Sequence, residues 1–178
     1  MKLIKKSTDP QEELLIEVDK NNKVIGKISR KTAHNSPSKY YRTIYVIVKN
    51  SDGLILLQKR SATKDLYPNC WDLSVGGHVN FGQSYLETAI RELKEELNIS
   101  ISNKDLKLLG ELLVKLPTSN EYFNVFEYIL KNTDDIKIET NELSQTKWMS
   151  VGDIKKSIKN NPSNWYPRPT QVITAFLL

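Results

Sequence analysis

The first half of the chain alternates short apolar runs with turn residues, a pattern that predicts β-strands. Residues 14–18 and 24–28 form two such runs around the turn residues Asn21 and Asn22. Residues 43–48 are almost continuously apolar and β-branched, as in a strand buried on both faces. A polar loop at residues 34–38 precedes this run, and a turn at residues 50–53 follows it. Further strands are predicted at residues 54–58, 71–75, 106–116 and 122–130.

The helical pattern is clearest at residues 84–97. Ser84, with Glu87 three residues later, forms the capping box that begins a helix. Apolar residues then recur at three- and four-residue steps on one face, at Leu86, Ala89, Ile90, Leu93 and Leu97. Residues 151–159 and 171–178 predict two later helices. Strands first, a helix between strands and helices late favour an α+β sandwich over a regular winding of βαβ units.

Composition is ordinary for a globular domain. The chain has 178 residues, of which 39% are apolar and 26% charged, which suits one domain with a hydrophobic core. Its one cysteine, Cys70, excludes an intramolecular disulfide and is typical of a reducing compartment. No apolar run approaches the roughly 18 residues of a membrane span. We therefore expect a soluble cytoplasmic protein with no membrane partner.

The net charge of +5 is compatible with anionic partners such as nucleotides or polyphosphates. A lysine-rich, solvated surface explains the same charge equally well. The sequence has no basic run interleaved with aromatic residues, so nucleic acid is not an expected partner.

Three glutamates lie on the predicted helix away from its apolar face. Spacings of three and four residues bring Glu92, Glu95 and Glu96 together on the helix surface. Like charges so placed repel one another, and a hard divalent cation relieves the repulsion because Mg²⁺ prefers carboxylate oxygens. A solvated charged face is the alternative interpretation of this spacing alone. The pair Gly76 and Gly77 precedes the helix, and glycine lets backbone approach a metal closely.

The residues around these glutamates match a known pattern. The segment from Gly77, GHVNFGQSYLETAIRELKEELNI, resembles the Nudix box, which spaces a glycine, a glutamate and an Arg-Glu-apolar-any-Glu-Glu run at fixed intervals. The matching positions are Gly77, Arg91, Glu92, Leu93, Glu95, Glu96 and Ile99. Asn98 stands where the pattern has glycine, and asparagine tolerates the left-handed conformation found after a helix. Gln83 stands where the pattern has glutamate, which keeps hydrogen bonding but loses a charge.

The resemblance implies a Nudix fold, an α/β/α sandwich with a mixed sheet and a metal-binding helix that follows a Gly-Gly loop. A single domain would span residues 1–178. Residues 1–40 would form a strand pair and loop, and residues 41–178 the Nudix core with its C-terminal helices.

The resemblance also assigns roles by position. Glu92, Glu95 and Glu96 would bind the metal, with Glu92 also a candidate base. Arg91 would hold a glutamate in place, and the carbonyl of Gly76 would be a further ligand. The expected metal is Mg²⁺, with Mn²⁺ as an alternative. It would bridge phosphate oxygens and lower the pKa of the water that attacks phosphorus.

Other segments resemble one branch of this family, type-1 isopentenyl-diphosphate isomerase. They include LLQKRSATK at residues 56–64 and NWYPRPTQV near the C-terminus. Arg60 and Lys64 match residues that grip the diphosphate, so they are candidate substrate-binding residues. The isomerase needs a cysteine just before its Gly-His pair, where this chain has Gly76, and Cys70 lies too early in the chain to substitute.

The isomerase-like metal site is also incomplete. His34, His78 and Glu121 match three of its ligands, but Tyr41 and Ser119 stand where two others belong. We interpret the chain as a relative that keeps the scaffold and lacks the isomerase apparatus.

Two glutamates outside the box are candidates to complete the catalytic site. Glu121 begins a predicted strand and matches an isomerase ligand, whereas Glu142 lies in a polar loop where many family hydrolases place a mobile base. The flanking resemblance favours Glu121.

The function predicted is Mg²⁺-dependent hydrolysis of a phosphoanhydride in a nucleoside diphosphate derivative or related small organic diphosphate. Isomerisation of isopentenyl diphosphate is one alternative. A nucleotide-sensing module without turnover is another, supported only by Gln83. The oligomeric state, including a homodimer, stays open.

Overall fold

The sheet is built around β3 (Tyr40–Lys49), which pairs with strands from distant parts of the chain. The computed structural model describes residues 7, 9–133 and 136–177. β3 runs antiparallel to β1 (Leu14–Val18) and β6 (Val75–His78), and parallel to β8 (Ser119–Ile129). The predicted buried strand at residues 43–48 is confirmed, and the sheet is mixed as expected.

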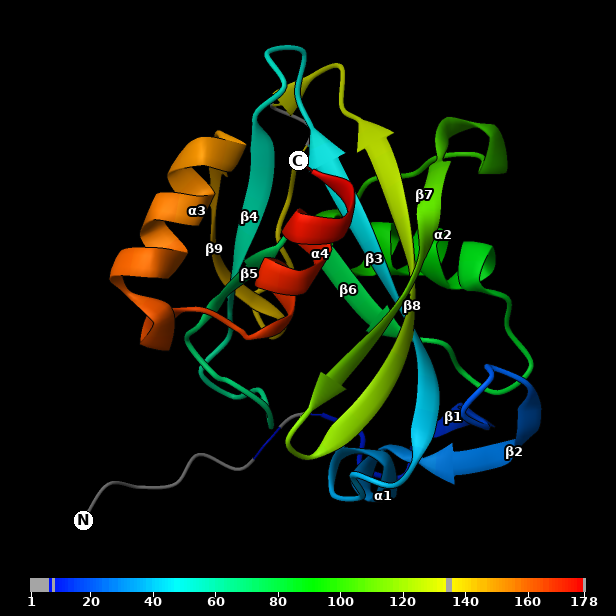
Figure 1. The fold of residues 1–178 in the computed structure, drawn as a ribbon. Coiled ribbons are helices and arrows are strands. Elements are labelled where there is room, and N and C mark those ends of the chain that lie inside the picture. Colours follow the sequence, from blue (N-terminus) through cyan, green and yellow to red (C-terminus); the bar gives the residue numbers. More distant parts are fainter. Residues whose placement is uncertain (1–6, 8, 134–135, 178) are drawn as a thin grey trace.

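The remaining strands extend this sheet on both sides (Figure 1). β2 (Val24–Ser29) pairs with β1, and β7 (Lys107–Leu116) pairs with β8. On the other side, β4 (Ile55–Arg60) pairs with β5 (Trp71–Leu73) and with β9 (Leu143–Met149).

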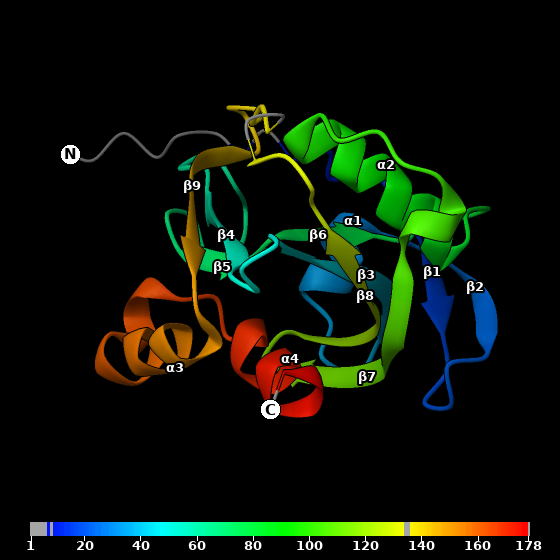
Figure 2. The same ribbon diagram turned by 90° about the horizontal axis from the view of Figure 1, so that it is seen from above.

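Helices cover both faces of the sheet (Figure 2). On one face, α2 (Tyr85–Leu97) packs its apolar residues against one set of β3 side chains, including Ile44 and Val46. On the other, α3 (Val151–Asn160) and α4 (Arg168–Phe176) pack against the alternate set, which includes Tyr45 and Ile47. Side chains alternate between the faces of a strand, so β3 supplies both cores. The α/β/α arrangement of the Nudix fold is confirmed.

Several features differ from the sequence-based expectation. A short helix, α1 (Arg30–His34), was not predicted; it ends at the first residue of the predicted polar loop, and Ser29 accepts a hydrogen bond from the amide of Thr32 as its cap. The strand β9, which pairs with β4, was not predicted, because its sequence LSQTKWM has only three apolar residues and they do not alternate with polar ones. Gly76 and Gly77 lie within β6 rather than in a loop.

The last helix begins at Arg168, three residues before the predicted start, and residue 178 of the predicted helix lies outside the described residues. None of the described helices is long and apolar enough to cross a membrane.

Candidate active site

Helix α2 is fixed at both ends by the residues that the sequence indicated. The Ser84 hydroxyl accepts a hydrogen bond from the Glu87 amide at 3.2 Å, and the Glu87 carboxylate accepts one from the Ser84 amide at 2.8 Å. At the other end Asn98 adopts the left-handed conformation with φ of 58°. This asparagine therefore performs the conformational role of the motif glycine.

The apolar face of α2 packs on the sheet, and this packing sets the direction of its glutamates. Glu92, Glu95 and Glu96 all line one cavity of about 410 Å³. Glu96 is buried, and its Oε2 atom has no hydrogen-bond partner among the described residues. Glu95 is the outermost of the three, with a side chain 53% exposed.

Burial and mutual repulsion disfavour charge on the two inner glutamates. Burial, and then the charges of Glu92 and Glu142, raise the pKa of Glu96 well above its usual value. Burial is also the main cause that raises the pKa of Glu92 to about 7, against the lowering effect of Arg91. A bound cation would give the unpartnered Glu96 oxygen a partner and would stabilise the charged form of both carboxylates.

Arg91 contacts two of the three glutamates, Glu92 and Glu95. Its guanidinium lies 2.9 Å from a carboxylate oxygen of Glu92 and 2.6 Å from one of Glu95. It also donates hydrogen bonds to the carbonyl of His78 and to the side-chain oxygen of Gln83, both at 3.3 Å. Gln83 thus acts on the site through Arg91, and it is not among the residues that line the cavity.

The two glycines of β6 lie directly beneath α2. A Cβ atom on Gly77 would overlap the side chain of Glu92, and one on Gly76 would lie 3.0 Å from the ring of Tyr45. Both glycines line the cavity. The sequence interpretation was that glycine lets the backbone approach a metal closely, and this stays a prediction. The close approach that the structure shows at Gly77 is to the side chain of Glu92.

The donor set fits a hard divalent cation. Glu92 and Glu96 offer carboxylate oxygens in one cavity, and Gly76 lies at the same wall. Across the described part of the chain, no three acidic, histidine or cysteine side chains already converge as a metal-binding group. Arg91 instead holds Glu92 and Glu95. The fit rests on the unpartnered Glu96 oxygen and on the raised pKa of both carboxyls.

Besides Arg91, four basic side chains line the cavity, namely Arg30, Arg60, Lys64 and Arg168. Lys64 bridges Asp9 at 2.5 Å and Glu142 at 2.6 Å. Arg60 donates from Nε to the carbonyl of Leu66 at 3.0 Å. The cavity therefore presents glutamates and cations together, which suits an anionic substrate that binds through a metal.

The structure separates the two candidate glutamates outside the box. Glu142 lines the cavity from the loop before β9. Glu121 is fully buried outside the cavity lining, 2.6 Å from Arg168, and accepts hydrogen bonds from Tyr41 and Ser119, both at 2.9 Å. Glu121 therefore faces an arginine and does not line the cavity. This arrangement argues against our prediction that Glu121, rather than Glu142, completes the catalytic site.

The remaining residues of the isomerase resemblance also lie near one another. His34 and His78 line the cavity with their Nε2 atoms 3.0 Å apart, and Asp65 lies 3.3 Å from Nδ1 of His34. Burial, and then the charge of Arg30, lower the pKa of His78 well below its usual value. Cys70 is not among the lining residues, and its thiol contacts the carbonyl of Ser163 at 3.7 Å.

Sequence reasoning missed several residues of this cavity. Arg30 contacts Asp9, Glu13 and Asp65, yet no motif singled it out. Tyr166 and Arg168 belong to the NWYPRPTQV segment, which carried a resemblance but no assigned role.

Comparison with known proteins agrees with this geometry. The NUDIX domain family model matches residues 39–169. An uncharacterised Nudix hydrolase from Nostoc sp. is 32% identical over 142 residues, covering 80% of this chain and 83% of that protein. A Nudix hydrolase from Deinococcus radiodurans is 30% identical over 136 residues, covering 75% of this chain and 76% of that protein.

The fold comparison gives the same result. The crystal structure of DR0079 from Deinococcus radiodurans superposes with a TM-score of 0.78 at 26% identity, covering 92% of this chain and 99% of that one. The chain belongs to the Nudix family and is a Nudix hydrolase.

Proposed function

We propose that this protein uses Mg²⁺, or Mn²⁺ in its place, to hydrolyse a phosphoanhydride in a nucleoside diphosphate derivative or a related small organic diphosphate. The observation that carries the proposal is the buried, unpartnered oxygen of Glu96, beside Glu92 in a cavity that also presents basic side chains. The size of that cavity is in the range of small-molecule sites.

Glu92 and Glu96 would hold the cation, with Glu95 as an outer ligand and the Gly76 carbonyl as a further one. The bound ion would supply charge neutralisation at the phosphate oxygens and a water of lowered pKa. Arg91 would keep Glu92 in position, because its guanidinium already contacts that carboxylate.

Arg60 and Lys64 would bind the diphosphate. Both line the cavity, and Arg60 has no carboxylate within ion-pair distance among the described residues. Lys64 is held by Asp9 and Glu142, so a phosphate would compete with these carboxylates for its ammonium.

Glu142 is the better candidate for a base outside the box. Its side chain is 37% exposed, lies in a loop and borders the cavity, so it has access to a water molecule. The buried ion pair of Glu121 with Arg168 supports a positioning role for Glu121 instead.

The two alternatives receive less support. Isomerisation would need a thiol for proton transfer, and Cys70 is not a cavity residue. The sensor interpretation rested on Gln83, which accepts a hydrogen bond from Arg91 and is not among the residues that line the cavity.

The direct test is a substrate panel of nucleoside di- and triphosphates, dinucleotide cofactors and isoprenoid diphosphates with Mg²⁺ or Mn²⁺, scored by chromatographic separation of the hydrolysis products. Glu96→Gln should lose at least about 10²-fold in rate, because even the partners of metal ligands cost roughly 10–100-fold. The fold should persist, because the buried Glu96 carboxyl oxygen Oε2 has no hydrogen-bond partner among the described residues that the substitution could remove. Full activity of Glu96→Gln with unchanged metal dependence would reject the proposal.

A further inference from the structure

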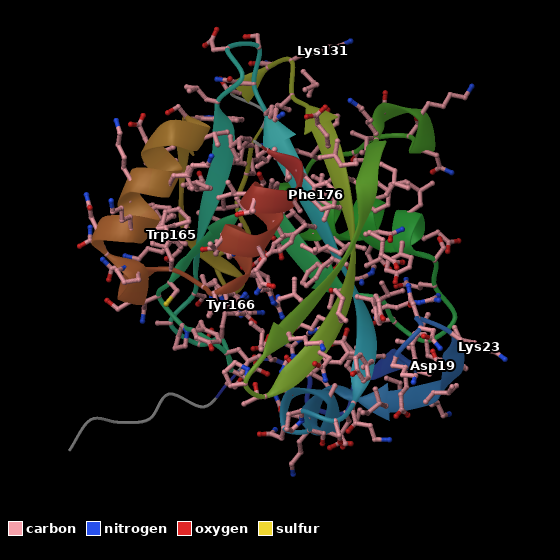
Figure 3. All side chains as sticks on the ribbon, viewed as in Figure 1. Asp19, Lys23, Lys131, Trp165, Tyr166 and Phe176 are labelled. Atoms are coloured by element: carbon pink, nitrogen blue, oxygen red, sulfur yellow. The ribbon has the colours of Figure 1, made fainter. Side chains whose placement is uncertain are left out.

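Two guanidinium groups meet at one tyrosine ring in the cavity. The central guanidinium carbon of Arg168 lies 4.3 Å from the centroid of the Tyr166 ring, and that of Arg60 lies 4.9 Å from it. The ring of Tyr67 stacks on Tyr166 at 4.5 Å between centroids. Figure 3 shows Tyr166 beside the start of α4, next to the chain segment that precedes β5. Arg60, Tyr166 and Arg168 all line the cavity.

Polar atoms of this group lack partners. Tyr166 is only 1% exposed and Arg168 only 7%. The hydroxyl of Tyr166 and the Nε atom of Arg168 nevertheless find no hydrogen-bond partner among the described residues. Buried polar atoms are ordinarily hydrogen-bonded, since an unpaired one costs about 1–3 kcal/mol. Unpartnered donors in two residues that line a cavity are suited to a ligand that accepts hydrogen bonds.

The charges of the group favour an anion. Glu121 contacts Arg168 through Nη2 and holds that guanidinium in a fixed position. Arg60 has no carboxylate within ion-pair distance among the described residues, so its positive charge is not offset by a direct partner. Burial raises the pKa of Tyr166, which keeps its hydroxyl protonated as a donor.

Two properties of the group select a terminal phosphate. A phosphate at the end of a diphosphate has three free oxygens and about two charges, whereas one esterified on both sides has two free oxygens and one charge. Planar guanidinium forks match phosphate oxygens in pairs. Because Tyr166 and Arg168 are buried, a compact terminal phosphate fits beside them more readily than a phosphate that carries a further substituent.

We propose that Arg60, Tyr166 and Arg168 form a subsite for the terminal phosphate of the substrate, so that the preferred substrates are diphosphates with a free phosphate end. This inference rests on the proposed function for the identity of the reacting group. The three residues would bind and position that phosphate, while the glutamates of α2 act on the phosphoanhydride.

The binding test uses inorganic diphosphate, a chelator and isothermal calorimetry, so that no metal or turnover contributes. Tyr166→Phe keeps the ring and its stacking and removes only the hydroxyl, and its melting temperature should equal or exceed that of the wild type. Loss of a hydrogen bond to a charged group should weaken diphosphate binding by about 10-fold or more. Tyr67→Phe is the matched control, since Tyr67 stacks on the same ring but does not line the cavity, and it should bind like the wild type.

A second variant and a second readout complete the test. Arg60→Gln should weaken diphosphate binding at least as much as Tyr166→Phe, because it removes a charge. With the best substrate from the panel, the ratio of kcat/KM for the free phosphate end to that for its methyl ester should exceed one. Tyr166→Phe should reduce that ratio by about the same factor as it weakens binding.

The outcomes separate this inference from the proposed function. Absence of diphosphate binding, or equal binding by wild type and Tyr166→Phe, would overturn the subsite. Turnover without any preference for the free phosphate end would do the same and leave the hydrolase proposal standing. Binding that depends on Tyr166 and Arg60, with no hydrolysis of any panel compound, would support the subsite and overturn the hydrolase proposal.

Discussion

Gly77 lies so close to Glu92 that a Cβ atom on the glycine would overlap the glutamate side chain. A strand residue thus sets the position of a carboxylate on the neighbouring helix. Since Glu92 also contacts Arg91, displacement of its carboxylate would disturb the whole cluster.

Gly77→Ala should therefore reduce kcat/KM by about 10²-fold, the scale expected from misplacing a reacting group by about 1 Å. Gly26→Ala is the matched control, because a Cβ atom there meets nothing within 4 Å. Steady-state kinetics and thermal unfolding of both variants provide the check. Activity of Gly77→Ala equal to that of the control would contradict the close-contact argument.

Metal affinity should rise with pH through about 7. The pKa of Glu92 is raised to about 7, so below that pH a proton competes with the cation for this carboxyl. Calorimetric titration with Mg²⁺ in buffers of different ionisation enthalpy should show proton release near pH 6.5 that is smaller in Glu92→Gln, where only Glu96 still carries a raised pKa.

The same raised pKa has a consequence for stability without metal. Between the unfolded value of about 4.5 and the folded value of about 7, the native state binds more protons than the unfolded state. The contribution of Glu92 to stability should therefore fall as pH rises through this window, and chemical denaturation of Glu92→Gln should lack that decline. Parallel pH profiles for the two proteins would refute the assignment.

Gln83→Glu should tighten metal binding. A carboxylate at this position would form an ion pair with Arg91, whose Nε already donates to the Gln83 oxygen, and so hold the guanidinium more firmly in the place from which it positions Glu92. The Mg²⁺ concentration for half-maximal rate should fall, and Gln83→Leu should raise it. If neither variant shifts that concentration, Gln83 has only a structural role.

Glu121→Gln and Glu142→Gln should have different effects. Removing the charge of Glu121 leaves Arg168 buried without its carboxylate, which should cost about 3–5 kcal/mol of stability. The Mg²⁺ concentration that Glu121→Gln needs for half-maximal rate should not change. Glu142→Gln should retain stability and lose kcat with little change in KM, as expected for a group that acts in the transition state. A raised metal requirement in Glu121→Gln with full stability would restore Glu121 as a ligand.

The sequence determined the features of this protein that depend on local spacing. The capping box of Ser84 and Glu87, the apolar face of α2 and the left-handed Asn98 all follow from residues within one or two helical turns. The same periodicity brings Glu92 and Glu96 to one side of that helix. Strand β3 was predictable because its residues are buried on both faces and are therefore almost continuously apolar.

The tertiary structure alone decided which distant side chains meet. Glu121 pairs with Arg168 because the register of β8 on β3 and the packing of α4 bring them together. Arg60 meets Tyr166 because β4 pairs with β5 and the Tyr166 amide donates to the carbonyl of Trp71 in β5. No local pattern encodes either meeting. The strand β9 could not be predicted for a similar reason, since it pairs with the distant strand β4 and its own sequence lacks an alternating apolar pattern. Side-chain periodicity determines the direction in which a residue faces, but only the packing of distant segments determines what it faces.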